Sequence, residues 1–211
     1  MRDNMITKRH RSAVDGGTSR STSRSLTMDA AVSGLFAALI AIGAFMKIVI
    51  PVGVDTMNFT LQWLFVLLAG LLLGSRRASR SVATYLITGL IGFPIFARGG
   101  GPAYLLRPTF GFLLGFAIAA WVMGFLSEKL HPSKVISWFW VSLAGYAVYY
   151  GMGILYFYMI THLLSSQTPT ALSVIFGVYC LPTMLPDLML CVLAIMIAGR
   201  LRPVVQASLN G

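Results

Sequence analysis

Apolar residues dominate this chain beyond residue 28, in six runs separated by short polar, glycine-containing or proline-containing stretches. A helix that crosses a bilayer needs about 20 mostly apolar residues, because it rises about 1.5 Å per residue through a hydrocarbon core about 30 Å thick. The six runs cover residues 29–50, 60–75, 81–97, 105–127, 136–161 and 171–199. The pattern predicts an all-α, polytopic membrane protein with six transmembrane helices in one bundle.

The first 27 residues differ from the rest, because they combine arginine and lysine with serine, threonine and glycine. Such a composition cannot bury enough apolar surface to fold, so it predicts a disordered basic tail. An organelle transit peptide is the alternative, but Asp3, Asp15 and the lack of an amphipathic stripe oppose it. We expect a membrane domain over residues 28–203 and a short C-terminal tail over residues 204–211.

Composition supports a membrane protein, with 57% hydrophobic residues, 10% charged residues and a mean hydropathy of +0.80. The net charge of +10 raises the question of nucleic-acid binding. That function would need one basic face, whereas the lysines and arginines here cluster at the ends of apolar runs. The expected partner is therefore the lipid bilayer and not nucleic acid.

Basic residues gather on alternate connections between the predicted spans. Beyond the tail they are Arg76, Arg77 and Arg80, then Lys129 and Lys134, then Arg200 and Arg202. The positive-inside rule places these connections and both termini in the cytoplasm, as expected for a protein of the cell membrane. The connection that holds Arg98 and Arg107 then faces outward, as does the start of the last span.

The stretch over residues 92–116, GFPIFARGGGPAYLLRPTFGFLLGF, interrupts the apolar pattern with glycine, proline and two arginines. Irregular backbone near membrane depth persists only where it is buried in protein or lines a cavity. Arg98 and Arg107 flank Gly99, Gly100 and Gly101, and such a loop can bring backbone N–H groups and a guanidinium to an anionic group. A solvated outer loop is the alternative.

Asp187 is the only acidic residue in the interior of an apolar run, since Asp29 stands at the first position of the first run. A carboxylate at that depth costs about 2.5–3.5 kcal/mol on insertion scales, so it should face the protein interior and have a partner. Three interpretations remain open: recognition of a polar ligand, an ion pair with Arg98 or Arg107, or a hydrogen bond to a carbonyl freed near Pro182.

Catalytic and metal chemistry have little support in the sequence. His10, His131 and His162 are scattered, and Cys180 and Cys191 would lie about 16 Å apart along one helix. We therefore expect no metal, no cofactor and no disulfide. The chain has no G-x-x-x-x-G-K-[ST] motif, so it has no ATPase site of its own. An intramembrane enzyme is a remote alternative, since no nucleophile and base pair is visible.

Small residues form a strip in the first predicted span, at Gly34, Ala37, Ala38 and Ala41. This spacing lets helix backbones approach closely, either within the bundle or with a partner helix. Aromatic residues, Tyr149 and Tyr150 among them, fit interfacial belts or the core between helices. We assign no chemistry to these aromatic residues.

The order of motifs resembles the BioY family, the biotin-binding membrane subunits of energy-coupling-factor transporters. The matching blocks are FTLQWLFVLLAGLLLG at residues 59–74, GLIGFPIFARGGGPAYLLRPTFGFLLGF at residues 89–116, and PDL at residues 186–188. The resemblance implies a six-helix protein that captures biotin from outside. It also implies that a coupling transmembrane protein and two ATPase subunits complete the transporter, although some members are thought to act alone.

The resemblance also implies roles for particular residues. The glycine-rich loop and the acidic residue of the last span would surround the ureido head of the ligand, and Phe96 and Tyr104 would pack its apolar parts. The small strip resembles an alanine motif that docks onto the coupling protein. The implied substrate-binding residues are Gln62, Phe96, Arg98, Gly99, Gly100, Gly101, Tyr104, Arg107, Thr109 and Asp187.

Three positions depart from the family pattern. Leu190 stands where relatives have a lysine three residues after the aspartate, and a Gly-Pro-Thr-Gly-Gly run reads Arg107-Pro-Thr-Phe110-Gly here. A ligand carboxylate near a buried Asp187 needs a compensating cation, because an unpaired buried charge is strongly disfavoured. We hypothesise that Arg98 or Arg107 replaces the lysine. The alternative is a site adapted to another small vitamin acid.

Overall fold

The computed structural model describes residues 26–52, 55–130, 134–164 and 171–210. Most of the predicted basic tail, residues 1–25, lies outside the described residues. The chain divides into two compact units, Met1–Val32 and Ser33–Gly211, and the site described below lies wholly in the second. The first helix, Leu26–Phe45, begins in the first unit and ends in the second.

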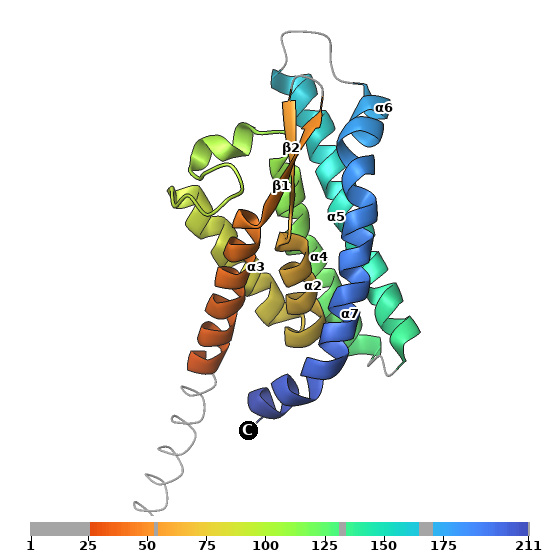
Figure 1. Cartoon of the computed structure of the whole chain (residues 1–211). Coiled ribbons are helices and arrows are strands. Elements are labelled where there is room, and N and C mark those ends of the chain that lie inside the picture. The colour runs from red at the N-terminus through yellow and green to blue at the C-terminus, as the bar shows by residue number, and fades with distance from the viewer. Residues whose placement is uncertain (1–25, 53–54, 131–133, 165–170, 211) are drawn as a thin grey trace, which may run out of the picture. The chain divides into compact units, whose positions relative to one another are not determined.

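The elements after the first helix are mainly helical, and the strands and α-helices among them are labelled in Figure 1. In chain order they are strands β1 (Lys47–Val52) and β2 (Asp55–Thr60), helices α2 (Gln62–Leu73) and α3 (Ser75–Ile91), the 3₁₀ turn η1 (Pro102–Leu106), helices α4 (Phe110–Leu130) and α5 (Val135–Leu164), the short α6 (Leu172–Val174), the π-helical turn η2 (Ile175–Cys180) and helix α7 (Leu181–Asn210).

Four of the described helices are long and apolar enough to cross a membrane. They are Leu26–Phe45, Phe110–Leu130, Val135–Leu163 and Leu172–Val205. Helix α2 has 12 residues, or about 18 Å, which is shorter than a hydrocarbon core. The protein is thus a mostly helical multi-pass membrane protein, while the predicted count of six spans is not confirmed. Helix α7 also continues through residues 204–210, which we expected to be a tail.

The prediction of an all-α fold is wrong for residues 47–60. These residues form an antiparallel hairpin in which Lys47 pairs with Thr60 and Val49 pairs with Asn58. The first apolar run therefore ends as a helix at Phe45 and not at residue 50. β-branched residues at 48–50 favour extended backbone, and Pro51 lacks the N–H that a continuing helix would need.

Helix α2 occupies the centre of the helical packing, with contacts to α7, α4 and α3. It is apolar on all sides, which is typical of a helix that is buried on all sides. Helices α4 and α5 approach closely because a Cβ at Gly115 would lie 2.8 Å from the Tyr149 carbonyl oxygen. This close approach fixes Tyr149 beside the start of α4.

The stretch between α3 and α4 is irregular, as predicted. Helix α3 ends at Ile91 and is followed by Gly92. Its φ of 125° is a backbone conformation that glycine adopts readily because it has no Cβ. The fourth run becomes helical only at Phe110 and not at residue 105, since η1 occupies residues 102–106. The loop over residues 92–109 lies at the same end of α4 as the hairpin (Figure 1).

A carboxylate from α4 holds the beginning of α3. The backbone N–H of Ser75 donates to Glu128 Oε1 at 2.8 Å, and the Ser75 hydroxyl donates to Glu128 Oε2 at 2.9 Å. Removing such a cap costs about 1 kcal/mol, so Glu128→Ala should lower the unfolding temperature by about 2–4 °C in detergent. Lys129→Ala is the control, and equal unfolding temperatures for the two variants would contradict the capping role.

Candidate functional site

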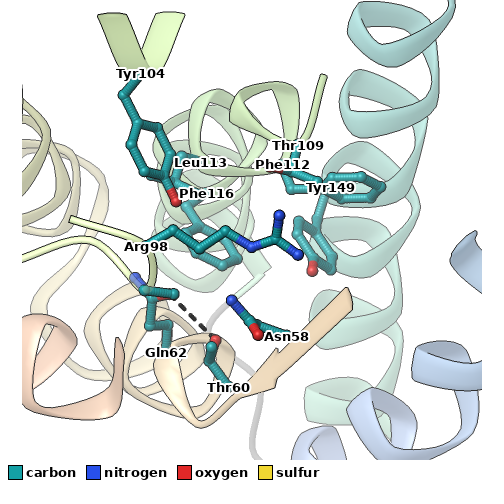
Figure 2. Close-up of a pocket in the computed structure, with 11 residues that line it drawn as sticks. Asn58, Thr60, Gln62, Arg98, Tyr104, Thr109, Phe112, Leu113, Phe116 and Tyr149 are labelled. Carbon is teal, nitrogen blue, oxygen red and sulfur yellow. Dashed lines mark hydrogen bonds between the residues drawn. The ribbon is translucent and has the colours of Figure 1, made fainter. Parts of the chain in front are cut away.

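Two adjoining hollows lie where the hairpin, the loop over residues 92–109 and the ends of the helices meet. The first, here called the arginine hollow, is lined by Asn58, Thr60, Gln62, Ala97, Arg98, Tyr104, Thr109, Phe112, Leu113, Phe116 and Tyr149 (Figure 2). The second, the aspartate hollow, is smaller and is lined by Asn58, Phe59, Thr60, Trp63, Phe116, Tyr149, Thr183 and Asp187. Four residues are shared, so the two hollows adjoin each other.

Asp187 lies in the aspartate hollow and is only 2% exposed. The Tyr150 hydroxyl donates to Asp187 Oδ2 at 2.7 Å and lies 3.0 Å from the Thr183 hydroxyl. The hydrogen-bond partner of Asp187 in the described part of the chain is thus the neutral phenol of Tyr150. It is neither Arg98 nor Arg107. A carboxylate has about four acceptor positions, so it retains capacity for a ligand's N–H groups.

Arg98 reaches the arginine hollow from the tip of a tight turn. Phe96 and Gly99 exchange both backbone hydrogen bonds, at 2.8 and 3.1 Å, which leaves Ala97 and Arg98 at the tip. Lys47 Nζ from strand β1 donates to the Ala97 carbonyl oxygen at 2.6 Å. The turn and the hairpin therefore hold each other beside the hollow, with the half-buried Arg98 side chain pointing into it (Figure 2).

The three loop glycines shape the turn and do not line either hollow. Gly99 and Gly101 adopt φ values of 111° and 98°, which disfavour residues with a Cβ. Their N–H groups donate to the carbonyl oxygens of Phe96 and Gly89, so neither is directed at a ligand. Gly100 packs against the Phe93 carbonyl so closely that a Cβ would overlap it. The expected backbone N–H cradle is thus absent at Gly99 and Gly101.

Tyr104 lines the arginine hollow, whereas Phe96 packs behind it with ring centroids 4.7 Å apart. Phe110 lies on another side of Tyr104, with centroids 6.3 Å apart. Arg107 is exposed and covers the Tyr104 ring from 5.4 Å, outside the lining of both hollows. Burial raises the pKa of Tyr104 while the positive charges of Arg107 and Arg98 oppose the rise, so the phenol keeps its proton at neutral pH.

Gln62 and Thr109 also line the arginine hollow. The Gln62 amide donates to the Tyr85 hydroxyl at 2.6 Å, and its oxygen accepts from the Thr60 hydroxyl at 3.1 Å. The polar atoms of Gln62 are therefore engaged within the protein, and they connect α2 to α3 and to the end of the hairpin.

An aromatic wall that the sequence analysis did not assign borders both hollows. Tyr149 stacks on Trp63 with centroids 4.6 Å apart and on Phe116 with centroids 5.0 Å apart. Tyr150, the next residue, is the partner of Asp187. A pair of tyrosines in an otherwise apolar run was the available signal, since a buried phenol needs a hydrogen-bond partner.

The hairpin residues Asn58 and Thr60 were also missed. Both line both hollows, because residues two apart on a strand point to the same face. Polar residues alternating with apolar ones over residues 56–60 were the available signal.

The small strip of the first helix does not form a single surface. Ala37 is buried at 8% exposure, whereas Gly34 and Ala38 are exposed and Ala41 is half-buried. Gly34, Ala38 and Ala41 share one face at helical spacing, so they are the members available to a partner.

The helices and the paired hollows define a class: a multi-pass membrane protein with a candidate small-molecule site, in which a cation and a carboxylate line two adjoining hollows. The model of the BioY family matches residues 12–207, and the chain belongs to that family. This confirms the resemblance seen in the sequence.

Relatives and a solved structure agree with this assignment. The probable biotin transporter BioY of Lysinibacillus sphaericus is 34% identical over 182 residues, covering 86% of this chain and 90% of the relative. The biotin transporter BioY of Thermotoga maritima is 37% identical over 172 residues, covering 81% and 93%. The structure of the S-component for biotin from an ECF-type ABC transporter matches with a TM-score of 0.71 and 25% identity, covering 87% of this chain and 93% of that chain.

Proposed function

We propose that the protein binds biotin and carries it across the membrane as the substrate-binding component of an ECF-type transporter. Its relatives are biotin transporters, so it is a transport component and not an enzyme. One observation supports the ligand assignment most strongly: Arg98 and Asp187 lie in adjoining hollows that share an aromatic wall. Small-molecule sites commonly combine apolar walls with a few placed polar groups in this way.

The chemistry of biotin fits this arrangement. Its cyclic urea has N–H groups that donate to a carboxylate such as Asp187, and its sulfur-containing ring is apolar enough to pack on Trp63, Phe116 and Tyr149. Its aliphatic chain ends in a carboxylate, which pairs with Arg98 in the arginine hollow. Of the two arginines considered, Arg98 is thus the replacement for the missing lysine.

The partners follow from the family and the sequence. The chain lacks an ATPase motif, so energy comes from a coupling transmembrane protein and two ATPase subunits, and biotin is cargo and not a cofactor. The exposed face with Gly34, Ala38 and Ala41 supports docking to the coupling protein. Charge asymmetry supports a cell-membrane protein with both termini, including the basic tail, in the cytoplasm.

A matched pair of arginine variants tests this function. Arg98→Ala should raise the Kd for biotin by about 10- to 100-fold, since a charge-assisted hydrogen bond contributes about 1.5–3 kcal/mol. Arg107→Ala removes the same charge from outside the hollow and should change the Kd by less than about 3-fold. Binding is measured by titration of the purified protein in detergent, with dethiobiotin and lipoate in parallel. A wild-type protein that prefers lipoate, or binds none of the three, would contradict the proposal.

A further inference from the structure

The junction between the two hollows contains three polar side chains. Asn58, Thr60 and Tyr149 line both hollows, together with the apolar Phe116. Asn58 and Thr60 come from strand β2, and Tyr149 comes from α5 on another wall (Figure 2). A ligand that extends from Asp187 to Arg98 passes these side chains, so their free hydrogen-bonding groups decide what the junction recognises.

Of the two strand residues at the junction, Asn58 is the one that still has hydrogen-bond donors available for a ligand. The Thr60 hydroxyl donates its proton to Gln62 Oε1, so Thr60 can only accept from a ligand. The half-buried Asn58 amide makes no hydrogen bond to any other described residue. It therefore retains two donor hydrogens and an acceptor oxygen beside the space that Arg98 enters.

We propose that Asn58 is a specificity-determining residue that donates a hydrogen bond to the ligand's carboxylate, alongside the Arg98 guanidinium. This inference rests on the proposed function. Figure 2 shows the two side chains entering the arginine hollow from different walls, Arg98 from the loop turn and Asn58 from the strand. The guanidinium of Arg98 has only hydrogen-bond donors, and the amide nitrogen of Asn58 is also a donor. The ligand group that forms hydrogen bonds with both must therefore be an acceptor.

A carboxylate suits this pair better than a neutral acceptor does. Its two oxygens accept from a guanidinium and an amide at once, and a donor already aligned beside an ionised group forms a stronger hydrogen bond. The geometry is held before binding, because Lys47 from the hairpin already donates to Ala97 next to Arg98. Asn58 thereby favours acids over the corresponding alcohols or amides, without adding net charge to the site.

Changing Asn58 and the ligand together tests this contact. The ligands are biotin and biotinol, in which a hydroxymethyl group replaces the carboxylate. Asn58→Ala should raise the Kd for biotin by about 10-fold and the Kd for biotinol by less than about 3-fold. Asn58→Asp places a negative charge beside the ligand carboxylate. It should raise the Kd for biotin by about 100-fold and change the Kd for biotinol by less than about 3-fold.

The control is Val49→Ala, which changes the residue paired with Asn58 across the hairpin. Val49 is 52% exposed and outside both hollows, so its replacement should leave the Kd for biotin unchanged. Equal losses for biotin and biotinol in Asn58→Ala, or no loss for either, would overturn the inference. A wild-type protein that does not bind biotin would instead refute the proposed function. Unfolding temperatures without ligand show whether each variant is folded.

Discussion

Replacing Asp187 with asparagine should abolish high-affinity biotin binding, with an expected rise in Kd of about 100-fold or more. The urea of biotin donates two N–H groups, and a buried donor left without a partner costs about 1–3 kcal/mol. The amide turns one acceptor atom into a donor that faces the ligand's own donors. Titration of the purified variant with biotin measures the change.

The same substitution should leave the fold intact, which separates recognition from stability. Asparagine fills nearly the same volume, and its side-chain oxygen can still accept the hydrogen bond of Tyr150 that now reaches Asp187 at 2.7 Å. We expect an unliganded unfolding temperature close to that of the wild type. Biotin at a hundred times the wild-type Kd should stabilise the wild type by about 2.7 kcal/mol and the variant by far less. Unchanged affinity in Asp187→Asn would remove Asp187 from the site.

The second large effect is expected at Gly100, although this residue touches neither hollow. A Cβ at residue 100 would overlap the Phe93 carbonyl, and because the obstacle is backbone, the turn itself must shift. Overpacking of this kind costs about 1–3 kcal/mol. Gly100→Ala should therefore displace the Phe96–Gly99 turn, move Arg98 away from the ligand and raise the Kd for biotin by about 10-fold or more.

Gly151→Ala is the matched control for this prediction. It makes the same substitution in helix α5, where a Cβ would meet nothing within 4 Å. Alanine is the better helix former, so the control should bind biotin as the wild type does and be equally or more stable. Equal affinities for the Gly100 and Gly151 variants would show that the turn does not position Arg98.

The resemblance in the sequence led to the right family, and hydropathy predicted most helices, but the lengths and types of elements near the site were less predictable. A short apolar run has nearly the same composition whether it ends a helix or begins a strand. This is why residues 47–50 were read as the end of a span, whereas they pair with residues 57–60. Helix α2 has only 12 residues because it begins just after the hairpin and ends at Gly74, whose φ of 79° does not continue a helix.

The sequence by itself determined that this is a multi-pass membrane protein, that its pattern breaks at residues 92–109, and that Asp187 must be buried against protein. Each follows from the cost of placing charge or unpaired backbone in hydrocarbon, which any arrangement of the chain must avoid. Only the tertiary structure distinguished Arg98 from Arg107, because a two-residue turn points Arg98 into the hollow, whereas Arg107 is exposed outside it. The positions of Tyr149, Tyr150 and Asn58 likewise depend on elements far apart in the sequence meeting around the two hollows, which no local pattern encodes.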